Sequence, residues 1–168
     1  MLRTRGRRWT AVLPTVLLGV LLLSGTAASA AKIPIAVIVH GQVPVNGLSL
    51  PELRQIFRGQ RQFWSNDLMI TLLTPPRGTP EREVLLRKIY EQRSELQYQQ
   101  YWINRLFSDG SSITPKDTGS HEMSASLARV IPGAIALVPA NKIPRGVKVL
   151  RIDGKQPGES GYPLVASG

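Results

Sequence analysis

One turn of the chain carries residue types that bind oxyanions. Residues 77–82 read RGTPER and lie between an apolar segment and an amphipathic one. A glycine lets the backbone approach a ligand, a hydroxyl donates a hydrogen bond, and an arginine offers a fork of donors. If the amphipathic segment is a helix, its free N–H groups and dipole add to the attraction. We therefore take Arg77, Gly78, Thr79 and Arg82 as candidate oxyanion-binding residues.

Two residues of the same turn oppose such a site. Pro80 has no N–H to donate, and Glu81 places a carboxylate where the anion would lie. The alternative interpretation is a helix start capped by Thr79, with solvated arginines. A second turn, at residues 118–120, has the same two interpretations. Ser120 either caps the next helix or contacts the anion.

Residue types for catalysis and metal binding are sparse. The chain has no cysteine, which argues against disulfides, thiol nucleophiles and a lipid-modified N-terminus. Its two histidines, His40 and His121, have no metal-binding spacing. No nucleophile elbow, P-loop or dinucleotide fingerprint occurs. We expect no catalytic residue, no metal and no cofactor, with an enzyme of unrecognised type as an open alternative.

The N-terminal segment has the composition of an export signal. Four arginines precede a 13-residue apolar run at residues 11–23, and Ala28-Ser29-Ala30 matches a cleavage site. The run is shorter than the about 20 residues that span a bilayer. We expect a cleaved signal peptide over residues 1–30, of Sec or Tat type, and a periplasmic domain over residues 31–168 without stable membrane insertion. An uncleaved anchor is the alternative.

The charge of the expected mature domain is lower than that of the whole chain. The 168 residues include 21 basic and 11 acidic ones, a net charge of +10 at pH 7. Residues 1–30 hold four of the arginines and no acid, so the remainder has a net charge of +6. That charge suits an anionic ligand or an acidic envelope surface. The lack of a basic run with interleaved aromatics argues against nucleic-acid binding.

Apolar runs alternate with amphipathic segments, which is typical of an α/β fold. Short apolar runs predict strands at residues 33–39, 68–73, 134–138 and 147–152. Helical spacing and capping residues predict helices at residues 49–57, from residue 79 onward, at 95–107 and at 120–131. Tyr98, Trp102 and Leu106 form one stripe of the third helix, and we expect its aromatic side chains to lie in the core, with a ligand platform as the alternative. We expect the turns at 77–82 and 118–120 to face the same cleft.

Several separated motifs resemble the phosphate-binding proteins of ABC transporters, specifically their second lobe. The matching segments are, in order, residues 48–59 (LSLPELRQIFRG) with Trp64, residues 70–85, Trp102, residues 132–138 (PGAIALV), and Asp153-Gly154 with Tyr162-Pro163-Leu164. The resemblance implies a periplasmic-binding-protein type II-like α/β fold, as a single lobe with a mixed sheet flanked by helices. It also implies oxyanion capture outside the cytoplasm, with phosphate or another small anion as ligand and an ABC transporter or another envelope protein as partner.

The candidate turn departs from the family pattern, which reads Arg-x-x-Asp-Gly-Ser-Gly-Thr-Arg. Gly78 and Arg82 match, and Thr79 keeps a hydroxyl where the family has serine. The differing positions are Thr74 for Arg, Arg77 for Asp, Pro80 for Gly and Glu81 for Thr. Tight capture of a dehydrated dianion needs many donors. We therefore expect the chain to bind an oxyanion weakly or not at all, or to be an envelope protein-interaction module that has lost ligand binding.

Overall fold

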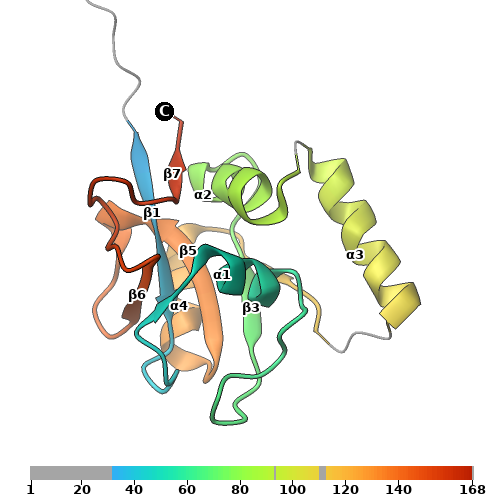
Figure 1. Ribbon diagram of the computed structural model, residues 1–168, viewed down its shortest axis with the longest axis horizontal. Coiled ribbons are helices and arrows are strands. Elements are labelled where there is room, and N and C mark those ends of the chain that lie inside the picture. The colour runs from blue at the N-terminus through green and yellow to red at the C-terminus, as the bar shows by residue number, and fades with distance from the viewer. Residues whose placement is uncertain (1–31, 93, 110–112, 168) are drawn as a thin grey trace, which may run out of the picture.

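A mixed β-sheet forms the centre of the computed structural model, which describes residues 32–92, 94–109 and 113–167 (Figure 1). The expected signal peptide lies outside these residues. The described strands run across the sheet in the order β2-β6-β1-β5-β3-β4, and β7 pairs with the start of β1. Their bounds are β1 Ile33–Val39, β2 Gly47–Leu48, β3 Thr71–Thr74, β4 Lys116–Asp117, β5 Ala134–Pro139, β6 Lys148–Ile152 and β7 Val165–Ala166.

The first strand, β1, is buried on both faces of the sheet. It pairs antiparallel with β5 and β6, whereas β3 pairs parallel with β4 and β5. Ile35, Val37 and Val39 enter one core, and Ala36 and Ile38 enter the other. A continuous apolar run is what a strand covered on both faces requires. The predicted fold class, a mixed sheet flanked by helices, is confirmed.

Helices cover both faces of this sheet. On one face, α4 (His121–Val130) packs through Ala125 and Ala128. The other face is covered by α1 (Leu50–Phe57) and by α2 (Pro80–Val84), which continues as the π-helix η1 (Leu85–Tyr90). The long helix α3 (Glu95–Asp109) lies outermost on that side (Figure 1), and a short 3₁₀ helix, η2 (Ala140–Lys142), follows β5. Among the described residues, no helix has the length and apolarity of a membrane span.

The helix starts lie at their predicted capping residues. In α1, Ser49 Oγ accepts from Glu52 N at 3.3 Å, and Ser49 N donates to Glu52 Oε2 at 2.7 Å, which completes the predicted capping box. Thr79 caps α2, and Ser120 caps α4. Such caps stabilise a helix by about 1 kcal/mol each because they satisfy N–H groups that the helix itself leaves free.

The second of the predicted strands, β3, begins later than predicted. It begins at Thr71 rather than at residue 68, because the preceding segment folds back on itself. Trp64 N donates to Leu68 O at 2.9 Å, and Ile70 N donates to Gln62 O at 2.9 Å. The strands β2, β4 and β7 were not predicted, since two residues are too few to show a period.

The predicted burial of the two aromatic side chains on the α3 stripe is confirmed. Tyr98 and Trp102 are buried, but Leu106 is 46 % exposed. Each step of four residues turns a helix by about 40° beyond a full rotation, so Leu106 has moved away from the face that Tyr98 occupies. The buried face of the helix is therefore limited to its first turns.

Candidate functional site

The two candidate turns leave the same end of the sheet. The parallel strands β3 and β4 pair with Thr74 opposite Asp117, so the segments after both strands begin side by side. Thr118 donates to Thr74 O twice, from its N at 3.0 Å and from its Oγ1 at 2.9 Å. Thr74 Oγ1 in turn donates to Asp117 Oδ1 at 2.6 Å. The structure thus brings residues 77–82 and 118–120 together at one edge.

The first part of the candidate turn is committed to the chain's own backbone. Gly78 has φ +77°, a left-handed conformation that favours glycine, and the space beside its Cα is open. Thr79 Oγ1 accepts from Arg82 N at 3.3 Å and donates to Pro76 O at 2.8 Å. The hydroxyl that was a candidate donor to an anion therefore donates to a carbonyl instead.

Arg82 is held by the chain's own carboxylates. Its side chain is only 2 % exposed, and its Nε and Nη2 donate to Glu95 Oε1 and Oε2 at 2.9 and 2.8 Å. Its Nη1 lies 3.4 Å from both Asp117 Oδ1 and Pro75 O. The guanidinium also lies 4.3 Å from the ring centroid of Tyr98, within cation–π range. The fork that was predicted to bind an external oxyanion thus binds an internal one.

The ion pair of Arg82 and Glu95 is charged at neutral pH. Burial on its own lowers the pKa of Arg82. The hydrogen bond with Glu95 and the nearby negative charges act in the opposite direction and outweigh burial, so the pKa of Arg82 is raised. The hydrogen bond with Arg82 lowers the pKa of Glu95 despite partial burial. Arg77, which is 60 % exposed, adds a weaker attraction, with its Nε 3.9 Å from Glu95 Oε2.

A second carboxylate lies between the two helix starts. Glu81, in the first turn of α2, is 1 % exposed, and its Oε1 lies 3.9 Å from His121 Nδ1, at the start of α4. This oxygen has no hydrogen-bond partner among the described residues. Ser120 Oγ accepts from Met123 N at 3.1 Å and so acts as a cap. Helix N-termini favour acidic side chains, and each helix has one in its first turn, Glu81 in α2 and Glu122 in α4.

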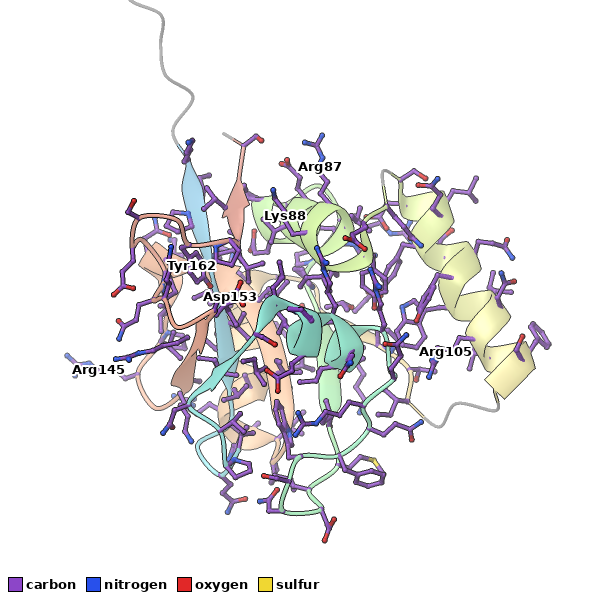
Figure 2. All side chains as sticks on the ribbon, in the orientation of Figure 1. Arg87, Lys88, Arg105, Arg145, Asp153 and Tyr162 are labelled. Atoms are coloured by element: carbon purple, nitrogen blue, oxygen red, sulfur yellow. The ribbon has the colours of Figure 1, made fainter. Side chains whose placement is uncertain are left out.

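An open groove of about 550 Å³ borders the candidate turn. Gly78, Thr79 and Arg82 line it together with Glu95, whereas Arg77 and Ser120 do not. The groove runs along η1, where Arg87 points outward at the end of the molecule at which β1 begins and β7 ends (Figure 2). Three of the predicted site residues therefore share one groove. Of the paired side chains, Glu95 is the more exposed and Arg82 lies beneath it.

A larger groove, of about 800 Å³, lies at the opposite edge of the sheet, beside β2 and β6. Its acids serve as caps of α1: Asp153 Oδ1 accepts from Leu50 N at 2.9 Å, and Glu52 closes the capping box. Within the described ranges, no three histidine, cysteine, aspartate or glutamate side chains are placed to hold a metal ion. We take the groove beside Arg82 as the candidate site because three of the predicted residues line it.

The partners of Arg82 were not predicted from the sequence. Glu95 lies thirteen positions after Arg82, beyond η1, and Asp117 belongs to the unpredicted strand β4. The only available signal was the spacing of Glu95 and Tyr98, three residues apart on one helix, which places a carboxylate and an aromatic ring on the same face. That spacing does not say which cation they receive.

Comparison with known proteins identifies the fold. No protein-family model matches the chain, and no curated protein matches it. Among solved structures, an ABC-type phosphate transport receptor from Vibrio cholerae matches with a TM-score of 0.66 and 17 % identity, over 83 % of this chain and 56 % of the receptor. PstS from Borrelia burgdorferi matches with a TM-score of 0.61 and 14 % identity, over 82 % of this chain and 56 % of that protein. The chain thus has the fold of a part of these proteins and spans little more than half of their length.

Proposed function

We propose that this chain, which has the fold of one part of a phosphate-transport receptor, is an exported module of substrate-binding-protein type that binds an oxyanion such as phosphate weakly or not at all. Export rests on the expected signal peptide, and the proposed location is the periplasm. The proposed partners are a small anion and an ABC transporter or another envelope protein. The proposal includes no catalytic step, metal or cofactor.

The enclosure of Arg82 carries this proposal. An arginine that is 2 % exposed and donates two hydrogen bonds to Glu95 has no free fork for a ligand. Phosphate would have to displace a carboxylate that is tethered beside the arginine and is therefore present at a high effective concentration. Glu83 also lines the groove and places a second carboxylate beside an incoming anion. Both features weaken oxyanion binding.

Isothermal titration of the purified, exported protein with phosphate, sulfate and acetate tests the proposal. We expect no measurable heat, or a dissociation constant weaker than about 100 µM, which corresponds to about −5.5 kcal/mol. A dissociation constant in the low micromolar range or tighter for any of these anions would contradict it.

An outward apolar face on α3 favours a second candidate function, a protein-interaction module of the envelope. Leu96 and Phe107 are 73 % and 88 % exposed, and Ile103 lies between them, so the three share one side of the helix at spacings of seven and four residues. Exposed apolar stripes of this kind are typical of contact surfaces. Replacing Phe107 with a photo-crosslinking residue tests this function. A monomer in light scattering that also forms no crosslink in the envelope would contradict it.

A further inference from the structure

We propose that Glu95 is a built-in competitor at the Arg82 site, so that an external oxyanion with two coplanar acceptor oxygens binds there only in exchange for the Glu95 carboxylate. The inference rests on the proposed function and gives a cause for weak oxyanion binding. The ligand class is set by the guanidinium fork, which pairs with carboxylates and with phosphates through two parallel hydrogen bonds.

The contacts of Arg82 leave one direction for a ligand. Asp117 and Pro75 take Nη1, and the Tyr98 ring covers one face of the guanidinium. Nε and Nη2 form the remaining edge, and both donate to Glu95. The side chain of Glu95 is 31 % exposed while that of Arg82 is 2 % exposed, so solvent reaches the pair from the carboxylate side. A ligand that enters from the groove therefore meets Glu95 before Arg82.

The exchange does not require α3 to leave the protein. The helix is held by aromatic contacts that do not involve Glu95: the rings of Tyr90 and Tyr98 meet edge to face at 4.9 Å, and Trp102 Nε1 donates to Tyr90 Oη at 3.1 Å. Glu95 is the first residue of α3, and its side chain is 31 % exposed, so one side of it already borders solvent. A rotation of one side chain is thus enough to free the edge of Arg82.

Truncation of Glu95 should create a vacancy that small anions fill. In a Glu95→Ala variant, Asp117, 3.4 Å away and 63 % exposed, is the one charged partner of Arg82 that is left among the described residues. A buried cation with so little compensation is unfavourable. An anion that binds the folded state alone restores stability in proportion to the logarithm of its concentration. Glu95→Ala should therefore melt at a lower temperature than the unchanged protein and recover in the presence of the right anion.

Thermal melts in sodium acetate, sodium phosphate and sodium chloride at equal ionic strength test this proposal. The melting temperature of Glu95→Ala is expected to rise in acetate, phosphate or both, well beyond its rise in chloride. Titration should show at least tenfold tighter binding of the same anion than in the unchanged protein. The matched control is Glu83→Ala, which removes a glutamate of the same groove whose partner, Arg87, is 64 % exposed and stays solvated; it should show no preference among the three salts. If the melting temperature recovers in acetate alone, the site binds carboxylates. If it also recovers in phosphate, the site binds tetrahedral oxyanions as well.

Equal responses of Glu95→Ala to all three salts would overturn the inference. If that variant does not fold, Glu95→Gln, which keeps the shape of the side chain and one acceptor, is titrated instead. Anion binding by Glu95→Gln that is no tighter than in the unchanged protein would also overturn the inference. If neither protein binds an anion, the inference fails while the proposed function stands. Tight binding by the unchanged protein and equally tight binding by the variant would contradict both.

Discussion

Loss of the charge on Arg82 is expected to destabilise the protein more than any surface substitution. Methionine is close in length to the aliphatic part of arginine, so Arg82→Met retains packing against Tyr98 and removes the hydrogen bonds to Glu95. Hydrogen bonds to charged groups contribute about 1.5–3 kcal/mol, and breaking a fully buried pair costs about 3–5 kcal/mol. The carboxylates left behind regain water, because Glu95 is 31 % and Asp117 63 % exposed.

We therefore expect Arg82→Met to lower the free energy of unfolding by about 2–3 kcal/mol, toward the lower end of those ranges. For a domain of this size the melting temperature should fall by roughly 6–15 °C. Urea denaturation followed by tryptophan fluorescence measures the effect for Arg82→Met, Glu95→Gln and the double variant. The coupling free energy between the two positions should be about 1–2 kcal/mol.

A control cycle on Arg87 and Glu83 separates this pair from an ordinary surface pair. These side chains approach to 3.2 Å, but Arg87 is 64 % exposed, so their coupling should be only about 0.3–0.5 kcal/mol. If the effects of Arg82→Met and Glu95→Gln add to within about 0.5 kcal/mol, the two residues do not interact, and the enclosure of Arg82 is wrong.

Three further predictions concern the cap of α1, two glycines and acid. Ser49→Ala removes the hydroxyl that caps Glu52 N, while the backbone N–H of residue 49 can still donate to Glu52, and should cost about 1 kcal/mol in urea denaturation; an unchanged midpoint would show that the cap is not formed. Gly133→Ala should prevent stable folding, because its Cβ would lie 2.1 Å from Met69 O, whereas Gly78→Ala at the same φ of +77° meets open space and should cost only about 1–2 kcal/mol; equal losses in thermal melts would refute this. The pKa of Glu95 is lowered by its hydrogen bond with Arg82, so its contribution to stability is complete above its ordinary value of 4.5 and is lost as the pH falls through the lowered pKa. Urea midpoints below pH 4.5 should therefore fall less steeply for Glu95→Gln, and identical slopes would contradict the pairing.

Local sequence signals predicted the parts of the fold that depend on neighbours in the chain. Ser49, Thr79 and Ser120 each cap the helix that their side-chain chemistry indicated. The apolar run of β1 indicated burial on both faces, and the structure divides its side chains between two cores. In both cases the deciding interaction lies within a few residues, or within one regular element, and can be read from spacing.

The site depends on contacts between distant segments, which spacing does not reveal. The turn at residues 77–82 was identified as an oxyanion candidate from the side-chain types of Gly78, Thr79 and Arg82, and these three residues share a groove. The carboxylates of Glu95 and Asp117 decide whether Arg82 is available, and they come from a separate helix and from a two-residue strand. A list of donors in one segment therefore says little about affinity until the acceptors packed against them are known.

A crystal structure of the purified protein grown with phosphate in several-fold excess would test the central claim most directly. We expect both oxygens of Glu95 within hydrogen-bond distance of Arg82 Nε and Nη2, as they are here at 2.9 and 2.8 Å, and no phosphate in the groove. Glu95 turned away from an unoccupied Arg82 fork, or a phosphate ion bound to Arg82 while Glu95 keeps both of its hydrogen bonds, would contradict the claim that this protein supplies the anion for its own site.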